Sequence, residues 1–285
     1  MRCISFLLYL CIIQTVSYAQ LTVTVRTAAE LLNALGSDRT IIVESGTYNL
    51  TQAAYTPNDQ IEWYESYDGP EAILKGVRNL TITGKVNTNI VAEPRYAWVL
   101  GFREVNNLTL KGLTFGHTEA GYCQGGVLLF DRCNSIRIEA CNLYGSGTIG
   151  ISMNAVNGFT CINSHIYECT YGLLGIYNAQ NVLFSKTSFS KTGNFDLIEI
   201  ISSRLVTFEK CNFTENYNSA FAPYFFRIDS NWLTAINQQE EVAESRQIVI
   251  KNCTFQNNQV HTFCDKTDKL TLQKNKFRNN IFVAP

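Results

Sequence analysis

The 285-residue chain has little excess charge, few prolines and methionines, and no long apolar run beyond its first residues. Its 23 Lys and Arg nearly balance 24 Asp and Glu, so neither a nucleic-acid-binding surface nor an acidic tail is indicated. Apolar residues make up 46% of the chain and charged residues 16%, which excludes a disordered or collagen-like protein. The three histidines are scattered and no Cys-x-x-Cys pair occurs, so we expect no metal site and no cofactor.

The N-terminus has the pattern of a secretory signal peptide. Arg2 is followed by an almost unbroken apolar run from Ile4 to Ile13, and Ser17-Tyr18-Ala19 supplies the small residues that a signal peptidase recognises. The run is shorter than the ~20 apolar residues that span a bilayer. We therefore expect a signal peptide over residues 1–19 and a secreted, periplasmic or cell-surface product with no transmembrane segment.

A short apolar pattern recurs along the rest of the chain. Each full copy begins with two apolar residues separated by one residue of any type. Two turn-forming residues, a small residue, a polar residue and a large apolar residue follow. The first residues of the copies lie 28, 28, 23, 23, 24, 42 and 22 positions apart, and a period of this length is typical of a solenoid. The copies, the first of them partial, are Leu80–Ile82, Leu108–Phe115, Ile136–Leu143, Phe159–Ile166, Val182–Phe189, Val206–Phe213, Ile248–Phe255 and Leu270–Phe277.

The period of two inside each copy predicts strands, and further apolar positions before each copy predict a third strand per repeat. Three short strands per coil, stacked at the ~4.8 Å spacing of paired strands, describe an all-β parallel β-helix. Thr27, with Glu30 three residues later, predicts a short helix through Leu35 that caps the first coil. We expect one domain over residues 20–285, with an inserted loop near 217–246 that either packs on the solenoid or serves in recognition.

Eight cysteines remain after residue 19, an even number that permits disulfides in an exported protein. Cys141, Cys211 and Cys253 fall in one column of small inward residues beside a tight bend, where cysteine acts as a small hydrophobic residue. We expect most of the eight to be buried thiols. One or two disulfides remain open, with Cys211 and Cys253 as a candidate pair because they occupy the same position in neighbouring coils.

The opening Ile41–Tyr48, with its Gly-Thr-Tyr, and the Asn-Leu-Thr units at Asn79–Ile82 and Asn107–Leu110 resemble the pectin-lyase-like superfamily of right-handed parallel β-helices. The resemblance covers nearly all of the chain after residue 19. It implies a right-handed, single-stranded β-helix and an association with acidic polysaccharides. Members of that superfamily cleave, epimerise or bind such polymers, and others are adhesins or accessory proteins without a known reaction.

The motifs that carry activity in that superfamily are not matched. Gly116-His117-Thr118 is only a partial echo of the Gly-His-Gly of polygalacturonases. The outward positions where pectate lyases bind calcium read Arg103, Asp131, Asn154 and Tyr177, without an aspartate cluster. No acid–base pair therefore transfers from a known member.

Candidate functional residues come from local chemistry instead. The glycine-rich segment Gly116–Gly126 holds His117, Glu119 and Tyr122, and histidine is well suited to proton transfer near neutral pH. As catalytic candidates we take His117, Glu119, Asp131 and Glu168, and as substrate-binding candidates Arg103, Tyr122, Asn154, Tyr171 and Tyr177. Asp196 and Glu199 could form a carboxylate pair for glycoside cleavage. Glu168, Lys191 and Glu215 occupy equivalent positions in successive coils, and an ordinary surface charge ladder is the favoured interpretation of this group.

Two functions remain open. One is a carbohydrate-active enzyme of the lyase, hydrolase or epimerase type, with its site at the 116–126 loop. The other is a non-catalytic solenoid that binds a glycan or serves a structural role at a surface. Both have a polysaccharide or surface glycan as partner and neither involves nucleic acid. Convergent titratable groups would favour the first, and ladders of Asn, Thr and Tyr on a flat face would favour the second.

Overall fold

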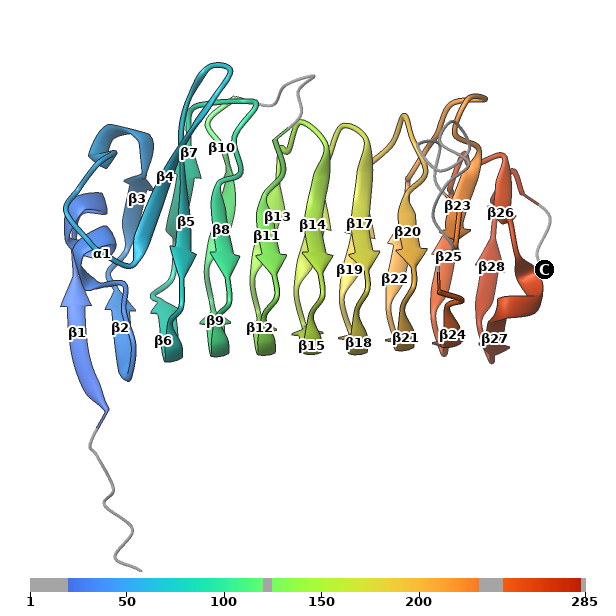
Figure 1. The fold of residues 1–285 in the computed structure, drawn as a ribbon. Coiled ribbons are helices and arrows are strands. Elements are labelled where there is room, and N and C mark those ends of the chain that lie inside the picture. Colours follow the sequence, from blue (N-terminus) through green and yellow to red (C-terminus); the bar gives the residue numbers. More distant parts are fainter. Residues whose placement is uncertain (1–19, 120–124, 231–242, 283–285) are drawn as a thin grey trace, which may run out of the picture.

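The computed structural model describes residues 20–119, 125–230 and 243–282 as a rod of stacked coils (Figure 1). Within these residues, three sheets run the length of the rod, and each coil contributes one strand to each sheet. The expected all-β parallel β-helix is confirmed. The signal peptide predicted over residues 1–19 lies outside the described residues.

The strands of each sheet follow one another in chain order. Sheet A consists of β1 (Leu21–Val25), β2 (Arg39–Val43), β6 (Arg78–Gly84), β9 (Asn106–Lys111), β12 (Asn134–Glu139), β15 (Asn157–Ile162), β18 (Gln180–Ser185), β21 (Arg204–Glu209), β24 (Arg246–Lys251) and β27 (Leu270–Gln273). Sheet B consists of β3 (Gly46–Asn49), β7 (Thr88–Ala92), β10 (Thr114–His117), β13 (Asn142–Tyr144), β16 (His165–Tyr167), β19 (Ser188–Ser190), β22 (Asn212–Thr214), β25 (Thr254–Gln256) and β28 (Lys276–Arg278). Sheet C consists of β4 (Ile61–Ser66), β5 (Gly69–Lys75), β8 (Leu100–Arg103), β11 (Leu128–Asp131), β14 (Ile149–Asn154), β17 (Gly172–Tyr177), β20 (Ile198–Ile201), β23 (Tyr224–Ile228) and β26 (Thr262–Cys264).

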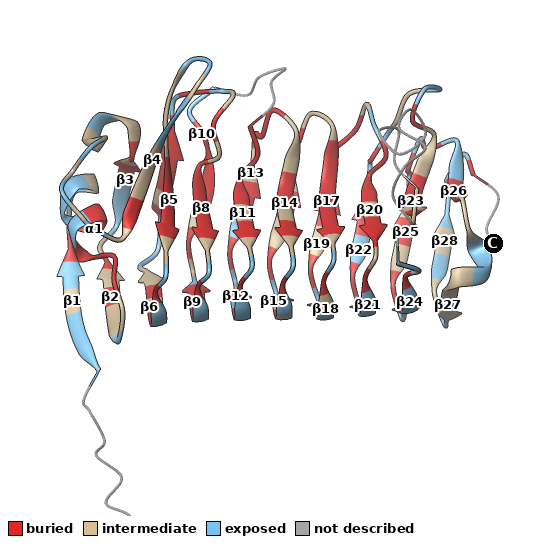
Figure 2. Ribbon diagram, in the orientation of Figure 1, coloured by how far each residue is buried: buried red, intermediate tan, exposed pale blue. Residues whose placement is uncertain are grey.

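The inward side chains form continuous columns, and the buried residues run through every coil (Figure 2). The repeat sets the register, since Leu108, Ile136 and Phe159 pair in successive strands of sheet A as their spacing predicts. In sheet B the ring of Phe213 lies 4.8 Å from that of Phe189 and 4.6 Å from that of Phe255, with nearly parallel planes. Stacked aromatic rings of this kind stabilise one coil against the next.

Side chains at the corners accept backbone hydrogen bonds from the preceding coil. The amide of Cys141 donates to Ser164 Oγ (3.1 Å), that of Cys211 to Cys253 Sγ (3.4 Å) and that of Cys253 to Asn275 Oδ1 (2.9 Å). The seven described cysteines are buried and free, so the candidate disulfide between Cys211 and Cys253 is wrong. Cys141, Cys211 and Cys253 occupy corner positions, where a small side chain fits, and Cys253 Sγ accepts a turn amide.

The N-terminal end is covered by α1 (Ala28–Ala34), whose Leu31 and Leu32 are buried (Figure 1). The predicted N-cap is confirmed, because Thr27 Oγ1 accepts the amide of Glu30, and the Glu30 carboxylate accepts the amide of Arg26, one residue before the N-cap. Two short 3₁₀ helices, η1 (Thr51–Ala53) and η2 (Thr267–Lys269), lie in turns.

Two features differ from the simple repeat. Strands β4 and β5 form an antiparallel hairpin whose two-residue turn, Tyr67-Asp68, lies between the paired Ser66 and Gly69. The 42-residue interval before the seventh copy contains β23, whose Phe225 and Phe226 are fully buried. The residues expected as a loop near 217–246 thus include an ordinary strand of sheet C, and the additional length follows Ile228. Residues 231–242 of that stretch lie outside the described residues.

Candidate functional site

His117 is an interior residue. It ends β10, is only 2% exposed, and its Nδ1 and Nε2 lie 3.1 Å from the Gly145 carbonyl oxygen and 3.0 Å from that of Ala97. Burial lowers the pKa of this imidazole, although the two carbonyl oxygens act in the opposite direction. With both ring nitrogens facing backbone carbonyls, His117 holds neighbouring coils together and presents no nitrogen to a polysaccharide outside.

The other catalytic candidates lie on different surfaces. Glu119 is exposed and forms an ion pair with Arg95 at 2.5 Å. Glu168 lies in the turn after β16, exposed and 3.9 Å from Lys191 as the charge-ladder alternative predicts. Asp131 projects from sheet C, whereas His117 is buried in sheet B. Tyr122 lies outside the described residues.

Arg103, Asp131, Asn154 and Tyr177 are in register on neighbouring strands of sheet C, as the repeat predicts. Arg103 Nη1 is 2.9 Å from Glu62 Oε2, and its Nε is 3.5 Å from Asp131 Oδ2. Asp131 also accepts a hydrogen bond from Asn154 Nδ2 at 3.1 Å. Glu62, Arg103, Asp131 and Asn154 are thus linked one to the next in a polar network on the outer face of the sheet.

Tyr177 turns away from this row toward the next strand. Its hydroxyl hydrogen-bonds Glu199 Oε2 at 2.6 Å, and its ring lies over Gly175. A Cβ on Gly175 would be 2.6 Å from Tyr177 Cε2, so the absence of a side chain there allows the tyrosine to reach the carboxyl group. Gly175, Glu199 and Arg227 are in register on β17, β20 and β23.

Asp196, just before β20, forms an ion pair with Arg227 on the next strand. The Asp196 side chain is 5% exposed and that of Arg227 14%. Asp196 Oδ1 also accepts the amide of Tyr224 at 2.9 Å, and the Arg227 guanidinium lies 5.0 Å from the centre of the Tyr224 ring. We refer to Tyr177, Asp196, Glu199 and Arg227 as the sheet C cluster.

The two carboxyl groups of the sheet C cluster have different environments. Burial raises the pKa of Glu199, and the nearby Asp196 charge adds to this, while the Tyr177 hydrogen bond and Arg227 oppose it. Asp196 instead has a direct guanidinium partner and a backbone amide. Glu199 is therefore the group suited to retain and donate a proton, while Asp196 is held in place by Arg227.

Exposed aromatic side chains occur close to the cluster in the sequence. Phe195 directly precedes Asp196 in the chain and is 44% exposed, and its ring meets that of Tyr171 edge to face at 4.6 Å. Phe221, in the following turn before β23, is 97% exposed. Flat exposed rings beside polar groups are suited to contact the apolar faces of sugar rings.

Sequence reasoning identified part of this arrangement. Tyr171 and Tyr177 were substrate-binding candidates, and Asp196 and Glu199 were considered as a pair whose separation was unknown. Arg227 was missed because it lies within residues 217–246, for which the sequence predicts an inserted loop. A signal was present: apolar residues alternate around it in Phe226-Arg227-Ile228, as they do around Glu199 in Ile198-Glu199-Ile200.

In the described part of the chain, no helix has the length and apolar character needed to cross a membrane. The same residues contain no group of three or more His, Cys, Asp or Glu side chains arranged to hold a metal ion.

Comparison with known proteins places the fold. Residues 99–237 match the family model described as "Right handed beta helix region". No curated protein matches the chain. Solved structures with a similar fold include pectate lyase (pelN) from Paenibacillus sp. 0602, with 9% identity, a TM-score of 0.56, and coverage of 91% of this chain and 78% of that one.

Two further structures are similar over most of their length. Pectin methylesterase PemA from Erwinia chrysanthemi has 10% identity and a TM-score of 0.51, with 94% of this chain and 91% of that chain covered. Alginate lyase from Paenibacillus sp. str. FPU-7 has 12% identity and a TM-score of 0.50, with 93% and 100% covered. The chain therefore has a parallel β-helix fold, and residues 99–237 match the right-handed type.

Proposed function

We propose that this protein binds a polysaccharide along the outer face of sheet C and cleaves it at the sheet C cluster. The observation that carries the proposal is the placement of two carboxyl groups, a tyrosine and an arginine on three neighbouring strands of one face, with Glu199 buried enough to raise its pKa. Groups with perturbed pKa values that converge on a surface are typical of catalytic sites.

The chemistry assigns different roles to these residues. Glu199 donates a proton to the oxygen of the glycosidic bond that breaks, and the Tyr177 hydroxyl orients its carboxyl group. In hydrolysis, water adds to the anomeric carbon and releases its proton to solvent; in elimination, the C5 proton of the uronic acid is lost to solvent and a double bond forms. Arg227 holds Asp196 and contributes positive charge near the reacting sugar, which suits a uronic acid polymer. Structurally similar proteins are named for pectate and alginate, and both are polymers of this kind. The exposed rings of Phe195 and Phe221 would contact neighbouring sugar rings of the bound chain.

A panel of pectate, pectin, alginate and neutral glucans tests the proposal, with product formation and binding measured separately. Glu199→Gln should lower the rate by at least about 100-fold, as loss of a general acid does, with little change in binding. Glu104→Gln, an exposed glutamate on the same rod, is the matched control and should leave the rate unchanged. An unsaturated, ultraviolet-absorbing product would indicate elimination, whereas a new reducing end without unsaturation would indicate hydrolysis.

Activity that survives Glu199→Gln would overturn the cluster as the catalytic site. The rival location is the 116–126 loop proposed from the sequence. Glu119→Gln tests that loop, because Glu119 is exposed and its replacement leaves the buried core intact. Loss of activity in Glu119→Gln alone would move the site there.

A non-catalytic, glycan-binding solenoid is the second candidate, and one observation favours it. Thr22, Thr40, Thr81 and Thr109 are in register on the outward face of sheet A, in strands β1, β2, β6 and β9. Such a row repeats its hydroxyl groups at the ~4.8 Å strand spacing. Glycan binding without turnover, weakened by Thr81→Val and unaffected by Glu199→Gln, would support this function in place of catalysis.

We further propose that the protein is exported and cleaved after Ala19, on the pattern of residues 1–19. The mass of the protein recovered outside the cells tests this. A mature chain that begins at Gln20 is expected, and retention of the first residues would contradict it.

A further inference from the structure

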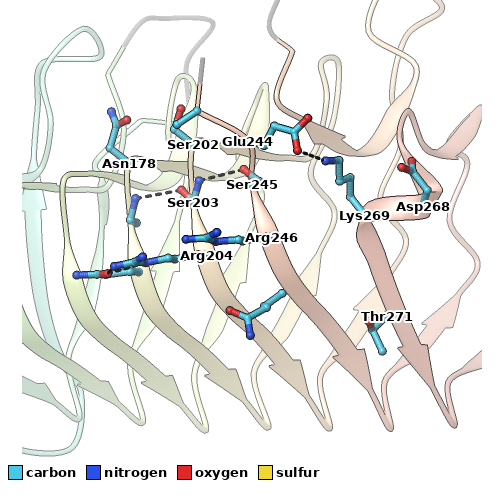
Figure 3. Close-up of a pocket in the computed structure, with 14 residues that line it drawn as sticks. Asn178, Ser202, Ser203, Arg204, Glu244, Ser245, Arg246, Asp268, Lys269 and Thr271 are labelled. Carbon is cyan, nitrogen blue, oxygen red and sulfur yellow. Dashed lines mark hydrogen bonds and ion pairs between the residues drawn. The ribbon is translucent and has the colours of Figure 1, made fainter. Parts of the chain in front are cut away.

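A cavity of about 840 Å³ opens where sheet C turns into sheet A in the last coils (Figure 3). It lies at the C-terminal end of the sheet C strands, on the side of sheet A, and none of the sheet C cluster residues lines it. Its lining is almost entirely polar and includes Gln180, Arg204, Arg246 and Lys269.

Arg204 and Arg246 stand side by side on this surface. They are in register at the starts of β21 and β24, so their backbones are separated by the ~4.8 Å strand spacing, and Figure 3 shows the two side chains nearly parallel. Like charges placed directly opposite each other on neighbouring strands are destabilising. The pair therefore calls for a compensating negative charge.

The described residues do not supply that charge. Arg204 donates to the neutral Gln180 Oε1 at 2.8 Å, and no carboxylate among the described residues pairs with either guanidinium. Three acidic residues lie nearby, and none pairs with either arginine. Glu244 pairs with Lys269 at 2.9 Å, and Asp229 accepts the amides of Ser202 and Ser245 at 3.0 and 2.7 Å. Asp268 lines the same cavity but forms no ion pair with Arg204 or Arg246.

The same row is different in the preceding coils. Asn106, Asn134, Asn157 and Gln180 hold the position of Arg204 in β9, β12, β15 and β18, and there the side chains are neutral amides. Arg78, at the start of the row, has a carboxylate partner, Asp38, at 3.4 Å. Among the described residues, Arg204 and Arg246 beside the cavity have no carboxylate partner. Arg78, at the other end of the same row, has one.

The geometry points to an oxyanion-binding site at Arg204 and Arg246, which would take a carboxylate or a sulfate ester carried on a polysaccharide. Two guanidinium groups at this spacing present paired N–H donors of the kind that bind such anions. The site is independent of the sheet C cluster, and its existence does not depend on catalysis. It would hold a second portion of an acidic polymer away from the cleavage site.

Calorimetric titration with inorganic sulfate tests the site, with sodium chloride at equal ionic strength as the reference. Binding of sulfate should weaken by about tenfold or more in Arg246→Gln and in Arg204→Gln, since each removes a charge-assisted hydrogen bond. Arg78→Gln, in the same row but paired with Asp38, should stay within about twofold of the unchanged protein. Oligogalacturonate and a sulfated oligosaccharide then distinguish the two sources of the anion.

The thermal midpoint provides a second readout. Sulfate should raise it in the unchanged protein more than chloride does, and this difference should disappear in Arg204→Gln/Arg246→Gln. Equal effects of sulfate and chloride, or equal losses in the Arg78→Gln control, would overturn the proposal. Absence of polysaccharide cleavage would not contradict the anion site, because sulfate binding is measured without turnover.

Discussion

Removal of the Arg227 guanidinium is the most informative perturbation of the sheet C cluster. In Arg227→Met, the Asp196 carboxylate would keep only the Tyr224 amide as a partner, at a position where its side chain is 5% exposed. Breaking a buried ion pair by removing one partner costs ~3–5 kcal/mol, because an uncompensated charge stays behind. Loss of the contact with the Tyr224 ring adds ~0.5–1 kcal/mol.

We expect a loss in the free energy of unfolding at the lower end of this range, about 3 kcal/mol, because Arg227 retains 14% exposure and water can reach it. The double variant Asp196→Leu/Arg227→Met removes both charges and should be more stable than Arg227→Met alone. Arg132→Met is the control, since it breaks an exposed pair with Glu104 and should cost at most ~1 kcal/mol.

Urea unfolding followed by circular dichroism measures these differences as shifts in the midpoint at constant slope. A loss of less than about 1 kcal/mol in Arg227→Met would refute the ion pair as a buried interaction. So would a double variant whose loss equals the sum of the losses in Asp196→Leu alone and Arg227→Met alone, because residues in direct contact should show a coupling energy.

Four further outcomes are expected. Phe213→Ala should cost ~3–5 kcal/mol, because its ring is fully buried between two others, whereas Phe277→Ala in the partly exposed last coil should cost clearly less by urea unfolding. Leu205 has a left-handed backbone (φ 56°) and is 42% exposed, so Leu205→Asn should raise the thermal midpoint by the equivalent of ~1 kcal/mol. The Glu199 pKa is raised, so the stability of the unchanged protein relative to Glu199→Gln should be highest at acid pH and fall as pH rises through that pKa. In a Cys123→Ser variant, the seven buried thiols should react with a thiol reagent only after unfolding.

The repeat predicts the fold because inward residues must be apolar at every second position, and this holds from Leu108 through Leu270. The same alternation bears on His117, which follows Phe115 by two residues and so shares its inward direction. Its glycine neighbours suggested a loop instead. At His117, the two-residue alternation of inward and outward side chains predicts the burial correctly, whereas the glycine content of the segment does not.

The candidate site was only partly predictable, because contacts between strands depend on how side chains bend across the surface. Tyr177 reaches Glu199 by lying over Gly175, and no spacing in the sequence specifies that direction. Arg227 required the prior recognition of β23 within an aromatic stretch. By contrast, the network of Arg103, Asp131 and Asn154 follows directly from register.

We propose that an acidic polysaccharide lies along the outer face of sheet C, over β17, β20 and β23. Titration of a uronic acid oligosaccharide into isotope-labelled protein, followed by amide chemical shifts, locates the bound polymer. We expect the largest changes at Gly175, Glu199 and Arg227, with smaller ones at the arginine pair of the cavity. Changes confined to the threonine row of sheet A, or to the residues around Glu119, would contradict it.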